Sequence, residues 1–174
     1  VTDNYGGSKE IVEALIKKGC KKILCLSITP SYISTIDDRI KGFVDATEKH
    51  HLNLGNEFIV PINFSKIQED TLGALKKMFY LHPDIDAVYT LNNHLGTATL
   101  KAFKDKAISK YYDKVQLACF DDIELFNLVD KPVLSVSQPV EEIGRNASIV
   151  MLEIIDEKKE NKSMIVLPTS LIVR

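Results

Sequence analysis

The chain has 174 residues, of which 45% are hydrophobic and 26% charged, and its formal net charge is -2. These totals are typical of a globular protein with one substantial domain or parts of two, and they argue against a nucleic-acid-binding module, which would show a basic patch. No apolar run reaches the length of a bilayer span, so we expect no membrane partner.

The three cysteines, Cys20, Cys25 and Cys119, lie within or beside apolar runs and are odd in number. We therefore predict that they are reduced and buried, as in a cytoplasmic protein. Because the four histidines have no metal-ligand spacing with the cysteines, we predict neither a metal nor a cofactor. The sequence begins with Val1 and reads there like the end of a strand, so we expect a piece of a longer protein.

Helical and strand patterns alternate along the first half of the chain. Asn4 to Ser8 has the composition of a turn, and Gly19 is expected to end the helix that follows it. Pro61 predicts an edge position for its strand. The expected elements, in order, are a helix over 8–18, a strand over 22–28, a helix from 36 to about 51, a strand over 57–62 and a helix over 67–82.

The second half continues the alternation. Pro139 is well suited to start a helix, because its missing N–H and restricted φ cost nothing there. The expected elements are a strand over 86–91, a helix over 95–106, strands over 115–120 and 133–137, a helix to about 155, a charged linker over 156–162 and closing strands over 164–174, broken by Pro168. This order predicts an α/β fold, a mostly parallel sheet with helices on both faces.

Two carboxylates, Asp121 and Asp122, follow directly after a buried strand. Ligands of open α/β sheets bind outside the carboxyl ends of the strands, which makes these residues candidates for a ligand site. The alternative is that one of them caps the next helix, and both roles can hold at once.

Arg39 is expected in the first turn of its helix, where a cation opposes the helix dipole. A guanidinium has five donors in a fork suited to pairs of hydroxyls or to a carboxylate, so Arg39 is a second candidate for the ligand site. The alternative is a surface arginine paired with Asp38 or Asp45.

Several stretches, in the same order along the chain, resemble motifs of the lac/gal repressor family of bacterial transcriptional regulators. In that family an aromatic-Asp-Asp strand end precedes a Gln-Pro crossover, an Asp-Arg-x-x-Gly-aromatic-x-x-Ala helix lies upstream, and a strand ends in Asn-Asp. The matching stretches are the turn over 4–7, DRIKGFVDA over 38–46, Asn92-Asn93, CFDD over 119–122, SVSQPVEEIGR over 135–145 and the closing run over 166–174. Cys119 replaces the usual Gly, and neutral Asn93 replaces the usual Asp.

The resemblance implies a periplasmic-binding-protein-like fold, in which two α/β subdomains joined by crossovers bind a small effector between them. It divides the chain into 1–20, a crossover and helix of the N-terminal subdomain; 21–137, the C-terminal subdomain; 138–160, a return helix of the N-terminal subdomain; and 161–174, closing strands. The apolar faces of both outlying helices would then lack cover in this chain. The implied effector contacts are Arg39, Asn92 and Asp121, with Phe120 and Tyr32 as stacking surfaces; the alternative for Phe120 is a core residue.

The function implied is the effector-sensing part of a cytoplasmic transcriptional regulator. The effector would be a sugar or a nucleobase-like molecule, operator DNA would be bound only through a headpiece outside this chain, and the protein would form a homodimer, in part through Thr97 and Ala98. A periplasmic or extracellular sugar-binding protein of the same fold is the alternative. An enzyme is not expected: phosphoacceptor receiver domains place their acidic pair after the first strand, whereas Asp121 and Asp122 come late.

Overall fold

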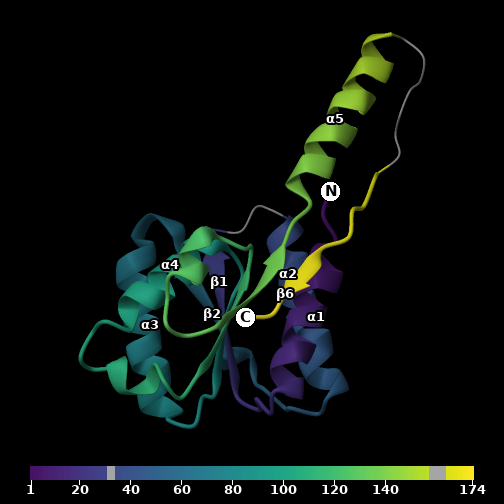
Figure 1. Cartoon of the computed structure of the whole chain (residues 1–174). Coiled ribbons are helices and arrows are strands. Elements are labelled where there is room, and N and C mark those ends of the chain that lie inside the picture. The colour runs from purple at the N-terminus through teal and green to yellow at the C-terminus, as the bar shows by residue number, and fades with distance from the viewer. Residues whose placement is uncertain (31–33, 157–163) are drawn as a thin grey trace.

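The computed structural model describes residues 1–30, 34–156 and 164–174, and its centre is a six-stranded sheet (Figure 1). The strands are β1 (Ile23–Thr29), β2 (Ile59–Asn63), β3 (Ala87–Thr90), β4 (Gln116–Phe120), β5 (Val133–Ser137) and β6 (Ser170–Ile172). Their order is β2-β1-β3-β4-β5-β6; β6 pairs antiparallel with β5, and the other pairs are parallel. The predicted fold class is therefore confirmed, and Pro61 does lie on an edge strand.

Helices cover both faces of this sheet (Figure 1). Alternate residues of β1 point to opposite faces: Ile23 and Cys25 pack with helices α1 and α2, while Leu24 and Leu26 pack with α3 and α4. The α-helices are α1 (Asn4–Lys17), α2 (Ser34–Lys49), α3 (Ile67–Leu81), α4 (Asn93–Ala102) and α5 (Val140–Ile155), and the 3-10 turns are η1 (Asn56–Phe58), η2 (Phe64–Lys66), η3 (Ser109–Tyr111) and η4 (Glu124–Asn127). The three cysteines are free and buried, as predicted.

Helix α1 begins at Asn4, so the prediction of a turn over Asn4 to Ser8 is wrong. The side chain of Asp3 caps the helix by accepting a hydrogen bond from the Gly6 amide at 2.8 Å. Gly7 lets the first turn approach the sheet, because a Cβ there would lie 3.1 Å from both Phe120 and Val136. At the other end Gly19 closes the helix with a φ of +95°, as predicted.

The apolar face of α1 is covered within this chain. Ile11, Val12 and Leu15 are fully buried against α2 and the sheet. The expectation that this helix would lack cover is therefore wrong: the helical pattern showed that the helix has an apolar face, but not which sheet the face would meet.

Helix α4 is shorter than predicted and ends at Ala102. The small residues of α4 pack against the sheet of this chain. A Cβ on Gly96, for example, would lie 2.9 Å from the sulfur of Cys119 in β4. Ala98 is likewise buried, which rules it out as part of a dimer surface, whereas Thr97 is partly exposed.

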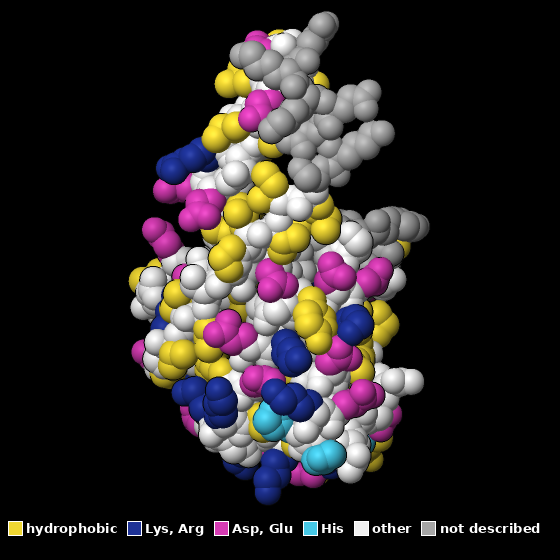
Figure 2. All heavy atoms as spheres, turned by 90° about the vertical axis from the view of Figure 1, so that its right-hand side faces the viewer, with side chains coloured by type: hydrophobic (Ala, Val, Ile, Leu, Met, Phe, Trp, Pro, Cys, Tyr) yellow, Lys and Arg dark blue, Asp and Glu magenta, His cyan; other side chains and the backbone are white. Residues whose placement is uncertain are grey.

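Helix α5 projects away from the body from the carboxyl end of β5 (Figure 1). Pro139 is its N-cap, as predicted, and none of its residues is buried. Apolar side chains gather on this projecting part (Figure 2), where Met151 is 58% exposed. The face of α5 therefore lacks cover, as predicted; most of the charged linker predicted to follow it lies outside the described residues.

Three short segments lie between the body of the molecule and its projecting part, which consists of α5 and residues 164–167. We call these three segments, residues 1–3, 138–139 and 165–168, the neck. Thr2 and Leu167 form a parallel bridge there, with the Asp3 amide donating to the Leu167 carbonyl and the Leu167 amide to the Val1 carbonyl, both at 2.8 Å.

In the described part of the chain, no helix combines the length and hydropathy needed to cross a membrane.

Candidate functional site

Polar side chains gather at the carboxyl edge of the sheet. Strands β1, β3, β4 and β5 are parallel neighbours, so their carboxyl ends meet at one edge. Asn92 follows β3, Asp121 follows β4 and Gln138 follows β5. Arg39, on α2, reaches the same edge, because it donates a hydrogen bond to the carbonyl oxygen of Leu91. The structure thus brings Arg39, Asn92 and Asp121 together, as the site prediction requires.

Arg39 is buried rather than exposed, with 6% of its surface accessible. Its Nε donates to Asn4 Oδ1 at 2.8 Å and its Nη1 donates to Leu91 O at 2.6 Å. The alternative of a surface arginine paired with Asp38 or Asp45 is therefore wrong; Asp45 instead accepts from Tyr5 and Lys41. The helix starts at Ser34, so Arg39 lies in its second turn rather than its first.

The electrostatic environment of Arg39 comes from two sources. Burial lowers its pKa, and the negative charge of Asp121 opposes that shift. Within the described residues, Nη2 has no hydrogen-bond partner, so this end of the guanidinium keeps two donors for a ligand. The charge is thus held in place by two of its nitrogens and remains available at the third.

The Phe120 ring packs against the Arg39 guanidinium. The guanidinium carbon lies 3.7 Å from the centre of the ring, a cation–π contact, and Phe120 is fully buried. Of the two roles left open for Phe120, the structure therefore favours the core residue over the stacking surface, because the ring has no exposed face to offer an effector. The strand pattern that indicated a buried strand here also applied to its last residue.

The two carboxylates at the end of β4 point to different partners. Asp121, with a φ of +90°, accepts from Gln138 Nε2 at 2.5 Å and from the Asn93 amide at 3.3 Å. Asp122 accepts from Ser135 Oγ at 2.6 Å and from Arg174 at 2.7 Å, and it joins the end of the chain to the sheet. Neither caps η4, the next helix along the chain, which has no side-chain cap, so the capping alternative is wrong; Asp121 belongs to the candidate site and Asp122 to the structural framework.

Asn92 has a double role. Its Oδ1 caps α4 by accepting from the Leu95 amide at 2.9 Å. Its Nδ2 has no partner within the described residues and can still donate to a ligand. Tyr32, the remaining predicted contact, lies outside the described residues.

An aromatic pair beside the site was missed by the sequence analysis. Phe64 directly follows β2 and is 53% exposed, and its ring meets the His94 ring edge-on at 5.7 Å. Exposed phenylalanine at a strand's carboxyl end is a surface on which a sugar or base ring can stack. The rule that singled out Asn92 and Asp121, a distinctive side chain just after a strand, would also have found Phe64.

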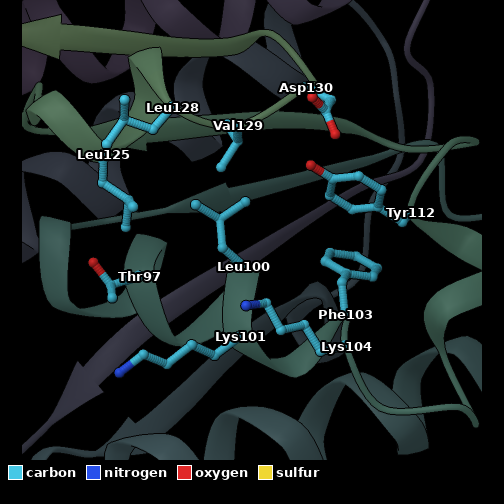
Figure 3. A pocket seen from close by; sticks show the side chains of 10 residues that line it. All are labelled: Thr97, Leu100, Lys101, Phe103, Lys104, Tyr112, Leu125, Leu128, Val129 and Asp130. Atoms are coloured by element: carbon cyan, nitrogen blue, oxygen red, sulfur yellow. The ribbon is translucent and has the colours of Figure 1, made fainter.

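A cavity away from these side chains lies on the α3 and α4 side of the sheet. It has a volume of about 490 Å³ and lies between α4 and the segment that follows β4 (Figure 3). Its walls are mainly apolar, with Lys101 and Lys104 along one side and Asp130 at the other (Figure 3). The parts of the chain that the structure describes contain no cluster of three or more His, Cys, Asp or Glu side chains able to hold a metal ion.

An open parallel sheet with charged side chains at its carboxyl edge is the architecture of a small-molecule-binding α/β domain. Residues 12–174 match the family model described as periplasmic binding protein-like domain. The chain belongs to this family, and the predicted resemblance to the lac/gal repressor family is confirmed.

Similar proteins include transcriptional regulators. The regulator CelR of Thermobifida fusca is 23% identical over 172 residues, which are 99% of this chain and 49% of the relative. The solved CelR–cellobiose complex has a TM-score of 0.86 at 23% identity, covering 99% of this chain and 52% of that one. A periplasmic binding protein/LacI transcriptional regulator of Alkaliphilus metalliredigens with D-xylulofuranose has a TM-score of 0.80 at 23% identity, covering 98% of this chain and 62% of that one.

The chain spans about half the length of the curated relatives it matches. These relatives are transcriptional regulators and not secreted solute-binding proteins. They therefore favour the effector-sensing part of a regulator over a periplasmic or extracellular sugar-binding protein.

Proposed function

We propose that this chain is the effector-binding part of a lac/gal-type transcriptional regulator and that its effector is a sugar or a related polyhydroxyl metabolite. One observation carries the proposal: the Arg39 guanidinium and the Asp121 carboxylate interact electrostatically at the carboxyl edge of the sheet. The guanidinium is held in place by hydrogen bonds from Nε and Nη1, and among the described residues its Nη2 has no partner. DNA binding through a headpiece outside this chain, a homodimeric state and a cytoplasmic location belong to the same proposal, and turnover of the ligand does not.

The donors and acceptors of the site suit hydroxyl groups. A sugar hydroxyl donates one hydrogen bond and accepts others, so it can bridge Nη2 of Arg39, which has no partner among the described residues, and an oxygen of Asp121. Among the residues that the structure describes, each oxygen of Asp121 has one partner, and it retains a lone pair for another. Asn92 Nδ2 adds a donor, and the exposed ring of Phe64 adds an apolar surface for the C–H face of a sugar.

The same proposal revises the division of the chain. Helix α1 belongs with residues 21–137, because its apolar face is buried there. Helix α5 and the segment over 164–167 belong with a second subdomain, because their apolar side chains lack cover. A ligand held between the two subdomains would favour their closed arrangement by its differential affinity for that state.

Titration calorimetry on the full protein tests this function, with cellobiose as the first probe in a panel of neutral mono- and disaccharides. For the sugar that binds, Arg39→Ala and Asp121→Asn should each weaken affinity, the former by about 2–5 kcal/mol. Arg39→Lys should recover only part of the loss, since an ammonium lacks the planar fork. The matched control is Lys77→Ala, which removes an exposed cation on α3.

Two outcomes would contradict the proposal. One is wild-type affinity in Arg39→Ala and Asp121→Asn for a sugar that binds the protein. The other is the absence of binding across the panel together with tight binding of a ligand that has no hydroxyl groups.

A further inference from the structure

One chain of hydrogen bonds, buried on the Arg39 side and partly buried on the Asp121 side, connects the two charges of the site through the neck. Arg39 Nε donates to Asn4 Oδ1 at 2.8 Å, and Asn4 Nδ2 donates to the Thr2 carbonyl at 3.0 Å. On the other side, Thr2 Oγ1 donates to Gln138 Oε1 at 2.8 Å, and Gln138 Nε2 donates to Asp121 Oδ1 at 2.5 Å. Thr2, Asn4 and Arg39 are all buried, so water competes little for the bonds on the Arg39 side.

The polarity of this chain is set by its charged ends. A guanidinium can only donate, so the oxygen of the Asn4 amide must face Arg39 and its NH₂ must face the Thr2 carbonyl. A carboxylate can only accept, so the NH₂ of the Gln138 amide must face Asp121 and its oxygen must face Thr2. The Thr2 hydroxyl is therefore obliged to donate, and both amides have a single satisfied orientation.

All three parts of the neck meet at Thr2. Its backbone forms the bridge with Leu167, its hydroxyl bonds to Gln138, and it belongs to the segment that leads into α1. A change in the hydrogen bonds of Arg39 can thus reach Thr2 through the side chain of Asn4, and a change in those of Asp121 can reach it through the side chain of Gln138. From Thr2 either change can reach every part of the neck.

We propose that Thr2 is a positioning residue that ties Arg39 and Asp121, through the amides of Asn4 and Gln138, to the pairing of the neck. This inference rests on the proposed function, because it takes Arg39 and Asp121 to be the charges that an effector engages. Occupation of the site would then alter the neck's stability directly, without first rearranging the core of the sheet.

Amide hydrogen exchange measured by NMR on the full chain, without ligand, tests the connection. The reporters are the Asp3 and Leu167 amides, which close the neck bridge, and the Tyr89 amide in β3 reports on the body. Thr2→Val keeps the shape and removes the donor; it should speed exchange at both neck amides about tenfold and leave Tyr89 unchanged. Thr2→Ser keeps the hydroxyl and should restore exchange close to the wild-type rate.

Asp121→Asn separates coupling from local packing. Alone, it should also speed exchange at Asp3 and Leu167, because the amide of Gln138 loses a charged acceptor. In the Thr2→Val background it should add little, since the connection is already broken and the two effects are not additive. Equal exchange in Thr2→Val and Thr2→Ser, or additive effects in the double variant, would overturn the inference.

The failure of this inference differs from the failure of the proposed function. Exchange is measured without ligand, so the connection can hold even if no sugar binds. Conversely, calorimetry can show sugar binding that depends on Arg39 while the neck amides remain unaffected by Thr2→Val.

Discussion

Gly42 lies where α2 crosses α1, and replacing it with alanine is the sharpest test of how the body holds Arg39. A Cβ at this position would lie 2.5 Å from the Tyr5 carbonyl oxygen, 2.9 Å from Ser8 Cβ and 3.1 Å from the Lys9 nitrogen. Two of these neighbours are backbone atoms of a helix, which cannot rotate away as a side chain could. The two helices must therefore move apart.

The magnitude follows from two opposing effects. Alanine is favoured over glycine in a helix by about 1 kcal/mol, whereas overpacking of a close contact costs about 1–3 kcal/mol and belongs at the upper end here. We expect Gly42→Ala to lower the free energy of unfolding by about 1–2 kcal/mol. Ser8 Oγ donates to the Arg39 carbonyl at 2.6 Å, so separating the helices should also displace Arg39 and weaken effector binding.

Gly73 supplies the control. It lies on the exposed face of α3, and a Cβ there would meet nothing within 4 Å. Gly73→Ala should therefore stabilise the protein by about 0.5–1 kcal/mol, the opposite sign. Urea denaturation followed by circular dichroism measures both variants. If Gly42→Ala proves as stable as Gly73→Ala, the reasoning about the helix crossing is refuted.

Three further predictions concern stability, reactivity and association. Thr71→Val should raise the free energy of unfolding by about 1 kcal/mol, because the buried Thr71 hydroxyl has no partner among the described residues; a lower urea midpoint would contradict this. Burial raises the pKa of the Cys20 thiol to about 11, so at pH 8 Cys20 of the native protein should react with a thiol reagent far more slowly than Cys20 of the unfolded protein. Equal rates would show that the surroundings of Cys20 open in the native protein. The 174-residue chain on its own should self-associate through the apolar side of α5 in sedimentation velocity, and Met151→Glu with Ile154→Glu should reduce association; a monomeric wild-type chain would mean that this side finds cover within the chain.

The strands were the most predictable part of the fold. Those at the centre of the sheet, such as β4 and β5, are buried on both faces and read as short continuous apolar runs. Pro61 also located the edge strand β2 correctly, because proline cannot donate to the ladder. These signals are local, so one sequence is enough to carry them.

The errors came from contacts between residues distant in the sequence. The start of α1 was misplaced because turn-forming residues such as Gly7 serve close packing against β4 and β5. The partners of Arg39 lie 35 and 52 positions away, at Asn4 and Leu91, and no local pattern connects them. The contact of the Arg39 guanidinium with the Phe120 ring likewise joins residues far apart in the sequence, and no local pattern connects them.

The two edges of the sheet have a consequence for solubility. Strand edges offer unpaired backbone groups to other molecules and are the usual route to fibrous aggregates. On one side Pro61 removes a donor from the middle of β2, and on the other β6 spans only Ser170–Ile172 and is held by the ion pair of Arg174 with Asp122. Both edges thus carry features that disfavour growth of the sheet from molecule to molecule, so we expect any association of this chain to involve the exposed apolar side of α5 and not the strand edges.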